Sequence, residues 1–287
     1  MSINLIFHLD PSFFEPFVAS LKAQTYTNIE TNILDTREDN IGFWAGQEKL
    51  LAQSHGKYII CMSDVILDKD FIKNAVEILE RDDQIGAVQA KILQSDGLID
   101  TTGFEIFKSR RIINRGKQTR NEYDAGEIFA VEGAVPVFRK QALESIIVHD
   151  PDASVGARTY LVDPDFRIGP YGYGDDLDLA WRMKNHGWKQ WYAPSVIAYH
   201  DRSTSGPRSN IPLIKKQLDW CNVRLAIIKN DGILHLLQDA PWWIVREIAV
   251  LGYMLLFEPR VLAIVPRFLR LLPSMLRRRS SAHAINH

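Results

Sequence analysis

Hydrophobic residues in the first part of the chain follow two alternating patterns. Short apolar runs of strand length lie at residues 3–9, 29–35 and 57–64. Residues 16–26 and 43–56, which separate these runs, have apolar side chains at helical spacing instead. Because strands that alternate with helices form mostly parallel sheets covered by helices, this order predicts an α/β fold.

The alternation continues through the middle of the chain and then stops. An amphipathic helix is predicted over residues 68–82 and a strand over residues 85–93. From residue 211 onward the apolar positions keep helical spacing with no strand between them. We therefore predict two parts, an α/β domain of residues 1–206 and a C-terminal amphipathic helical region of residues 207–287.

Acidic residues end two of the predicted strands. Asp35 ends the second strand and Asp64 ends the third. Ligands of parallel α/β sheets bind beyond the carboxyl ends of the strands, so both acids are placed for ligand binding. Asp also starts helices and turns at such positions, which leaves the structural interpretation equally open for each acid taken alone.

Three further acids, Asp175, Asp176 and Asp178, lie within four residues just before a predicted helix. Acids in a first helical turn cap free N–H groups, and Asp178 lies four residues before Arg182, the spacing of a surface ion pair. Capping needs fewer than three acids. The preceding "YGYG" offers close turns and aromatic faces, which together with carboxylates suit a sugar ring and a general base.

Composition and charge exclude some functions. The 287 residues, 46% hydrophobic and 24% charged, describe an ordinary globular protein, and the net charge of −1 argues against nucleic-acid binding. The two cysteines lie far apart in apolar or helical contexts, which favours a reducing compartment over a disulfide framework. The N-terminus lacks the basic and apolar regions of a secretory signal, so we expect a cytoplasmic protein.

Seven segments, in order, resemble the inverting glycosyltransferases of family 2, in their bacterial rhamnosyltransferase-like and galactofuranosyltransferase-like branch. They are "AQTYTNIETNILD", "DNIGFWAG", "GKYIICMSDVILDKDFI", "DDQIGAVQAKILQSDGLIDTTG", "VEGAVPVFRKQALESI", "YGYGDDLDLAWRMKNHGW" and "WYAPSVIAYHDRSTSG". The resemblance covers about residues 1–206. It implies the GT-A fold, a Rossmann-like, mixed, mostly parallel sheet flanked by helices. It also implies transfer of a sugar from a dTDP- or UDP-sugar to a saccharide hydroxyl, in bacterial surface polysaccharide synthesis.

The resemblance further implies roles for individual residues. Asp176 is expected to be the catalytic base with Asp175 beside it, and the like charge of Asp175 should raise the pKa of Asp176. Asp64 and His200 are expected to hold Mg²⁺ or Mn²⁺ against the donor diphosphate. The expected nucleotide-binding residues are Asp35, Asn40, Gly42, Gly46 and Ser63. The expected acceptor-binding residues are Tyr171, Tyr173 and Arg182.

The chain departs from the family pattern in two places. Asn40 follows Asp35 by only five residues, so a helix and an edge strand of the family are missing. The metal segment reads Met62-Ser63-Asp64, with one acid where many members have two. These departures leave open a non-catalytic scaffold in a polysaccharide-synthesis complex. A sugar nucleotidyltransferase is disfavoured, because no Gly-rich, basic phosphate loop follows the first strand.

The C-terminal region is basic and apolar. From residue 240 onward it has seven Arg and two acids, and residues 241–257 are apolar apart from Arg246 and Glu247. This length and these charges disfavour a transmembrane span, whereas a pair of tryptophans with flanking arginines suits an anionic membrane surface. We expect peripheral binding to the inner face of the cell membrane, where a lipid-linked acceptor would lie. Packing of these helices on the α/β domain or in a homodimer is the alternative.

Overall fold

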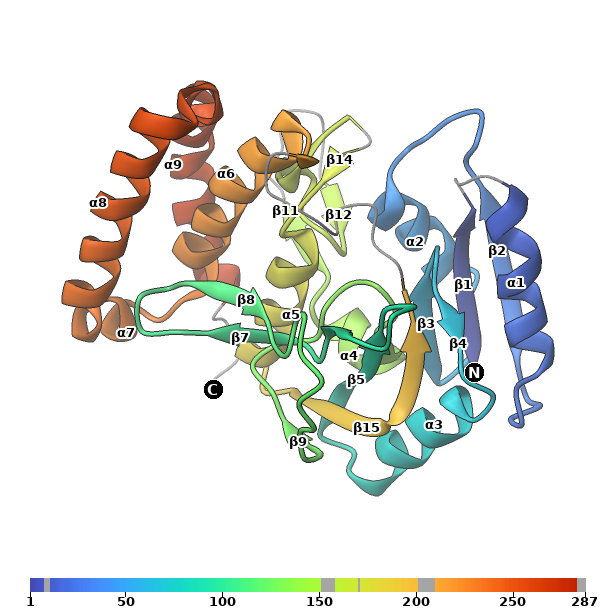
Figure 1. Ribbon diagram of the computed structural model, residues 1–287. Coiled ribbons are helices and arrows are strands. Elements are labelled where there is room, and N and C mark those ends of the chain that lie inside the picture. Colours follow the sequence, from blue (N-terminus) through green and yellow to red (C-terminus); the bar gives the residue numbers. More distant parts are fainter. Residues whose placement is uncertain (8–10, 151–157, 170, 201–209, 283–287) are drawn as a thin grey trace.

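The structure is a computed structural model that describes residues 1–7, 11–150, 158–169, 171–200 and 210–282. A mixed sheet with helices on both faces forms its centre, and a group of C-terminal helices packs at one end (Figure 1). The predicted domain boundary between residues 206 and 207, and the "DRSTSG" segment after His200, lie outside the described residues.

The predicted mixed sheet flanked by helices is confirmed, although only three of the six neighbouring pairs along its main strand order are parallel. Its main strands, in spatial order, are β2 (Glu30–Asp35), β1 (Ser2–Phe7), β3 (Tyr58–Met62), β10 (Val137–Arg139), β5 (Ile85–Leu93), β15 (Lys189–Tyr199) and β4 (Ile66–Leu67). β2, β1 and β3 are parallel neighbours, as are β5 and β15. β10 lies antiparallel between β3 and β5, and β4 is antiparallel to β15.

Shorter strands extend the sheet or form separate hairpins. β6 (Ile99–Thr101) and β9 (Gly126–Glu127) pair with β5 and β15. The separate pairs are β7 (Phe104–Ile106) with β8 (Ile112–Asn114), β11 (Val148–Asp150) with β12 (Arg158–Tyr160), and β13 (Arg167–Ile168) with β14 (Tyr171–Gly172).

The shortened segment after Asp35 lies at the edge of the sheet. β2 is the first strand in the spatial order, and the chain passes from it to α2 (Phe43–Leu51) with no further strand or helix. Removal of an edge strand leaves the pairing of the inner strands intact, so the fold tolerates this departure from the family pattern.

Two apolar cores lie on opposite faces of the sheet. Successive side chains of a strand point to opposite faces, so Ile60 and Met62 of β3 enter one core and Ile59 and Cys61 enter the other. The first core is covered by α1 (Pro11–Lys22) and α3 (Phe71–Arg81). The second is covered by α2, α4 (Lys140–Ser145) and α5 (Asp175–Asn185).

A third core joins the C-terminal helices to the α/β part. These helices are α6 (Leu213–Asn230), α7 (Ile233–Gln238), α8 (Ala240–Phe257), the 3₁₀ helix η3 (Pro259–Ile264) and α9 (Val265–Ala282). Leu177 and Trp181 of α5, with Phe166 of the short 3₁₀ helix η1 (Pro164–Phe166), pack with Leu225 of α6 and Met275 of α9. The two parts that we predicted from the sequence therefore share buried contacts.

Candidate active site

A cavity of about 470 Å³ opens where several parallel strands end. Its walls come from the segments after β2, β3 and β15 and from the first turns of α2, α5 and α6. This is the edge of an α/β sheet at which ligands bind. The cavity is lined by Asn40, Gly42, Phe43, Trp44, Ser63, Asp64, Glu132, Gly133, Ala134, Arg167, Tyr171, Gly172, Asp175, Asp176, His200 and Lys215.

The cavity collects most of the residues that we predicted for the site. Those in its wall are Asn40, Gly42, Ser63, Asp64, Tyr171, Asp175, Asp176 and His200. Asp35, Gly46, Tyr173 and Arg182 lie elsewhere. Eight of the twelve predicted site residues therefore lie in the wall of this cavity, and the other four lie in other surroundings.

Asp175 and Asp176 lie in a wall that two cavities share. A second cavity, of about 450 Å³, adjoins the first, and both are lined by these two acids together with Glu132 and Gly172. Tyr173 lines the second cavity only. The other residues of the second cavity include Asn114, Lys117 and Asp219. A carboxylate in this wall can face a ligand on either side.

Backbone groups hold the Asp176 carboxylate in place. Its Oδ2 accepts a hydrogen bond from the Gly133 N–H at 3.1 Å, and its Oδ1 accepts one from the Leu177 N–H at 2.8 Å. A β-carbon at position 133 would lie 2.9 Å from Asp176 Cβ, and one at position 172 would overlap the Asp175 carboxylate. Glycine at these two positions lets the backbone approach the acids closely.

The pKa values of both acids are raised. Burial raises the pKa of Asp176, and the negative charges of Glu132 and Asp175 raise it further. Burial also raises the pKa of Asp175, against the opposing effects of backbone hydrogen bonds and the Arg167 guanidinium. The predicted effect of Asp175 on Asp176 is therefore present, and Glu132 adds the larger contribution of the two charges.

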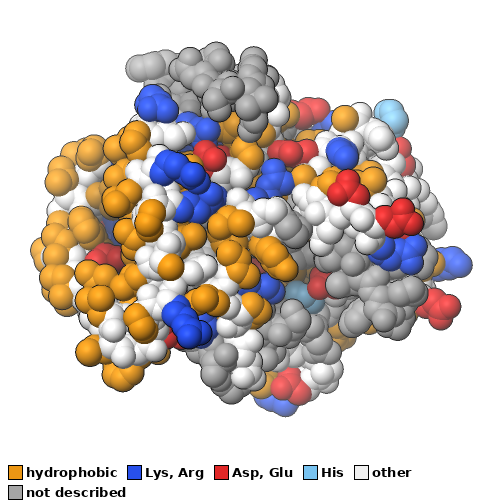
Figure 2. All heavy atoms as spheres, turned by 90° about the horizontal axis from the view of Figure 1, so that it is seen from above, with side chains coloured by type: hydrophobic (Ala, Val, Ile, Leu, Met, Phe, Trp, Pro, Cys, Tyr) orange, Lys and Arg blue, Asp and Glu red, His pale blue; other side chains and the backbone are white. Residues whose placement is uncertain are grey.

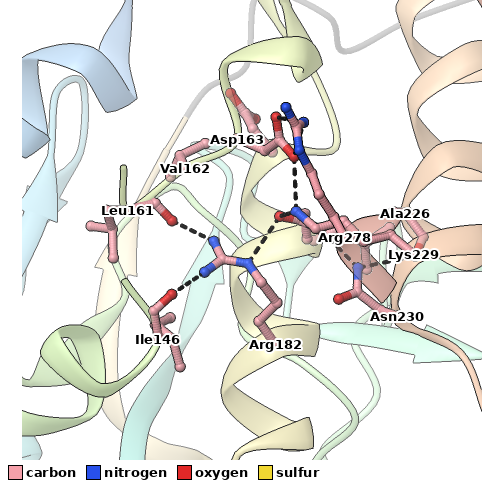
Figure 3. A network of polar contacts seen from close by, with 12 residues as sticks. Ile146, Leu161, Val162, Asp163, Arg182, Ala226, Lys229, Asn230 and Arg278 are labelled. Carbon is pink, nitrogen blue, oxygen red and sulfur yellow. Dashed lines mark hydrogen bonds and ion pairs between the residues drawn. The ribbon is translucent and has the colours of Figure 1, made fainter. Parts of the chain in front are cut away.

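Asp178 and Arg182 form an ion pair, but the pair is buried and not on the surface as the sequence suggested. Arg182 Nε lies 3.1 Å from Asp178 Oδ2, and both side chains are almost completely buried. The rest of the Arg182 guanidinium donates to the backbone carbonyls of Ile146 and Leu161 (Figure 3). A side chain engaged in this way does not fit the acceptor-binding role that we expected for Arg182.

The Asp178 carboxylate also anchors α6. Its Oδ2 lies 2.9 Å from Lys229 Nζ, and its Oδ1 accepts a hydrogen bond from Asn230 at 2.7 Å. Although burial opposes ionisation, Lys229 and Arg182 hold the pKa of Asp178 below its usual value. Lys229 and Arg278 of α9 in turn both pair with Asp163, so one network ties α5, α6 and α9 together (Figure 3). Asp178, the last acid of the cluster, therefore has a structural role.

Asp64 and His200 meet across the first cavity. His200 Nε2 lies 3.4 Å from Asp64 Oδ2, although 136 residues separate them in the chain. The other ring nitrogen, Nδ1, lies 3.2 Å from Oδ2 of the fully buried Asp100. A carboxylate behind a histidine fixes the orientation of the ring and is common behind metal ligands.

The donor set of this pair suits a divalent cation that is shared with phosphate. Within the described residues, no three His, Cys, Asp or Glu side chains form a metal-binding group. One carboxylate oxygen and one imidazole nitrogen are enough where substrate phosphates and water complete the coordination of Mg²⁺ or Mn²⁺. Asp64 and His200 therefore fit the cation that the resemblance implies.

The residues expected at the nucleotide occupy different surroundings. Asn40 Oδ1 accepts a hydrogen bond from the Gly42 N–H at 3.0 Å, which shapes the turn into α2. Gly46 is buried against Ile6, where a side chain would collide with the strand, so it serves helix packing. The Asp35 carboxylate is half exposed and pairs with Arg37 at 2.6 Å, outside the wall of the cavity. Base recognition by Asp35 stays a prediction.

The sequence interpretation missed several polar residues of the site. Glu132 and Arg167 line the cavity beside the two acids, Lys215 reaches it from α6, and Asp100 lies behind His200. The acid before the glycine in "VEG" and the acid in "IDTTG" were present in segments that we compared with the family, but nothing in their local pattern indicated a role. Lys215 lies beyond the predicted domain boundary.

Comparison with known families identifies the family of the chain. The profile of the family described as "Glycosyltransferase like family 2" matches residues 51–222, more than half of the chain. The chain belongs to this family. The match starts within α2 and ends within α6, so it includes both acids of the shared wall and the Asp64–His200 pair. A comparison with curated proteins finds no match.

Solved structures of glycosyltransferases share the fold of this family 2 member at low identity. The mannosyltransferase PcManGT from Pyrobaculum calidifontis, in complex with GDP-Man and Mn²⁺, is 13% identical with a TM-score of 0.53, and the match covers 99% of this chain and 86% of that one. S. aureus TarS is 12% identical with a TM-score of 0.58, and the match covers 99% and 52%.

A third similar structure is GalNAc-T7 with UDP, GalNAc and Mn²⁺, at 11% identity and a TM-score of 0.53. That match covers 79% of this chain and 47% of the other, so the chain spans about half the length of that protein. At these identities the three comparisons show the GT-A-like fold of the family. The particular rhamnosyltransferase-like and galactofuranosyltransferase-like branch stays a prediction.

Proposed function

We propose that this family 2 protein transfers a sugar from a nucleotide-sugar donor to a saccharide hydroxyl, with inversion at the anomeric carbon. The observation that carries the proposal is the position of Asp176 in the wall between two cavities. The first cavity contains the Asp64–His200 pair and receives the donor. The second contains Tyr173 and polar side chains and receives the acceptor.

Asp176 acts as the general base in this reaction. Its carboxylate removes the proton of the acceptor hydroxyl while the hydroxyl oxygen attacks the anomeric carbon from the face opposite the departing diphosphate. One bond to the anomeric carbon forms as the bond to the diphosphate oxygen breaks, so its configuration inverts. The raised pKa of Asp176 suits this role, because a base works best with a pKa near the working pH.

Asp64 and His200 would hold the divalent cation on the donor side. Mg²⁺ or Mn²⁺ there supplies positive charge against the diphosphate that leaves. Asp100 holds the His200 ring in the orientation that points Nε2 toward Asp64. Arg167 and Lys215 add two cationic side chains to the same cavity, and this supports the binding of an anionic donor.

A dTDP- or UDP-sugar is the proposed donor, and Tyr171 and Tyr173 are proposed to contact sugar rings. Both tyrosines are exposed, with about half of the Tyr171 surface accessible, so their rings are available to a ligand. Synthesis of a bacterial surface polysaccharide is the proposed context. These assignments rest on the resemblance of the sequence to its branch of the family.

A screen of nucleotide sugars by thermal stabilisation tests the proposal. With a bound donor the folded state is favoured by mass action, so a true donor should raise the melting temperature, and should do so more in the presence of Mn²⁺. The variant Asp176→Asn should keep this stabilisation and lose transfer by a factor of roughly 10² or more.

Two outcomes would contradict the proposal. Normal turnover by Asp176→Asn would exclude Asp176 as the base. No stabilisation by any UDP, dTDP or GDP ligand, with or without Mn²⁺, would instead favour the non-catalytic scaffold. Calorimetry of nucleotide binding by the unmodified chain provides an independent measurement of the second point.

A further inference from the structure

The outer surface of α7 and α8 is a continuous apolar face. Its exposed side chains are Ile233, Leu234, Leu237, Trp242, Ile244, Val245, Ile248, Leu251, Tyr253, Leu255, Leu256 and Phe257. We refer to these residues as the apolar face. Soluble monomers rarely expose an apolar patch of this extent unless it binds something. Figure 2 shows hydrophobic side chains gathered over the C-terminal helices, whereas Asp, Glu, Lys and Arg side chains are mixed at the other end of the same view.

The charges of α8 point toward the protein. Of its 18 residues only Met254 is buried, and its only charged residues are Arg246 and Glu247. Glu247 lies 2.6 Å from Arg224 of α6 and also pairs with Arg246, so these charges lie on the side that faces α6. The outward side of α8 carries no charged residue. This is the reverse of the pattern of a surface helix in water.

Exposed basic residues lie on the elements that follow α8, and the acids of this region are paired with cations. Arg260, Arg270 and Arg277 are exposed on η3 and α9. Three acids follow Asp231 in the chain, and each contacts a cation. The pairs are Asp239 with Arg110, Glu247 with Arg224, and Glu258 with Lys216. Lys and Arg side chains lie among the hydrophobic ones in Figure 2. An apolar surface followed by elements with exposed arginines matches anionic lipid headgroups over acyl chains.

We propose that the apolar face binds the surface of an anionic lipid membrane, with α8 lying in the plane of the interface. By length and composition, α8 is the one helix among the described residues that could cross a membrane, which differs from the expectation from the sequence. However, its 18 residues span about 27 Å, less than the ~30 Å of a hydrocarbon core. The ion pair between Glu247 and Arg224 of α6 also keeps one side of α8 against the protein.

The end of α8 is linked to the helix that lines the second cavity, the proposed acceptor side of the active site. Glu258, directly after α8, pairs with Lys216 of α6 at 2.8 Å. Asp219, one turn further along α6, lines the second cavity. If the proposed function holds, an acceptor sugar on a membrane lipid would reach Asp176 without the protein leaving the bilayer. This part of the inference rests on the proposed function, whereas membrane binding itself does not.

Flotation of the full chain with vesicles tests the membrane surface. Vesicles of phosphatidylcholine with about a third phosphatidylglycerol should carry the chain, and pure phosphatidylcholine should carry less of it. The variant Ile248→Gln with Leu256→Gln should bind the anionic vesicles about tenfold less or weaker still. The control, Ile33→Gln with Ile66→Gln, removes two exposed isoleucines of the sheet and should float like the unmodified chain.

The result that would overturn the proposal is equally clear. The proposal fails if the unmodified chain does not float with the anionic vesicles, or if both double variants float with them as well as the unmodified chain does. Light scattering after gel filtration tests the homodimer. If the unmodified chain is a dimer that does not bind vesicles, and the Ile248→Gln, Leu256→Gln variant is a monomer, the apolar face binds a second copy of the chain instead. Sugar transfer plays no part in these measurements, so they are independent of the proposed function.

Discussion

At the scale of single residues, the proposed chemistry depends on the surroundings of one carboxylate. Asp175, Asp176 and Asp178 are identical side chains within four positions, yet the pKa is raised for the first two and lowered for the third. The first two are buried beside other acids, whereas Asp178 contacts Lys229 and Arg182. Neighbours from distant parts of the chain therefore decide which acid can act as a base.

The pH dependence of transfer should report on Glu132. Burial, Glu132 and Asp175 raise the pKa of Asp176 to about 7, so kcat/KM should rise with pH through this value as the base becomes ionised. The variant Glu132→Gln removes one negative charge, which should lower the pKa of Asp176 and move the acidic limb down by about half to one pH unit.

The matched control for this measurement is Glu127→Gln. Glu127 is a half-exposed acid of β9 that lies near Lys184 and does not line either cavity. Its substitution should leave the acidic limb in place. An acidic limb that is unchanged in Glu132→Gln, or shifted equally in both variants, would show that Glu132 does not act on Asp176.

Asp100 should affect metal binding through His200. The variant Asp100→Asn keeps the size of the side chain and removes its charge, so the affinity for Mn²⁺ in the presence of UDP should fall about 10–100-fold. Calorimetric titration with Mn²⁺ measures this without turnover. The control is Asp96→Asn in the exposed turn before β6, and equal affinities in the two variants would contradict a role for Asp100.

At the scale of elements, α5 has two functions along its length of about three turns. Its first turn presents Asp175 and Asp176 to the cavities, and its next turns carry the buried pair that fixes the helix to α6 and to the loop before η1. The helical period that places Asp178 four residues before Arg182 was visible in the sequence. The burial of this ion pair was not visible in the sequence, because the pair is covered by α6 and α9, which lie far along the chain.

Loss of Arg182 should destabilise the protein strongly. The variant Arg182→Met leaves Asp178 buried with one cation fewer and frees two buried carbonyls, so the free energy of unfolding should fall by about 3–5 kcal/mol. The variant Arg81→Met removes the same residue type from the exposed pair with Glu77, also at a spacing of four, and should cost less than about 0.5 kcal/mol. Urea denaturation compares them, and similar costs would contradict the structural role of the network.

At the scale of the whole molecule, the C-terminal helices complete the fold and supply part of the site. Phe166, Leu177 and Trp181 are buried against α6 and α9, and Lys215 of α6 lines the first cavity. The predicted division after residue 206 therefore separates residues that share a core. The apolar residues of α7 and α8 are exposed and form the apolar face.

Truncation should show this dependence. A chain that ends at residue 210 lacks α6 to α9, which exposes the third core and leaves Asp178 without Lys229. It should not unfold cooperatively, whereas a chain that ends at residue 232 keeps α6 and should retain a transition at a lower temperature. Differential scanning calorimetry provides the comparison. A chain of residues 1–210 with the melting temperature of the full protein would instead support an independent α/β domain.

The sequence by itself determined the order of strands and helices, the carboxyl-end position of Asp64 and the acid cluster at the start of α5. These are local properties, because hydrophobic period and turn chemistry act over a few neighbouring residues. Only the tertiary structure decided that Asp100 lies behind His200, that Glu132 faces Asp176 and that Arg182 is buried. Burial and electrostatic coupling depend on which distant segments are in contact, and a local sequence pattern does not determine those contacts.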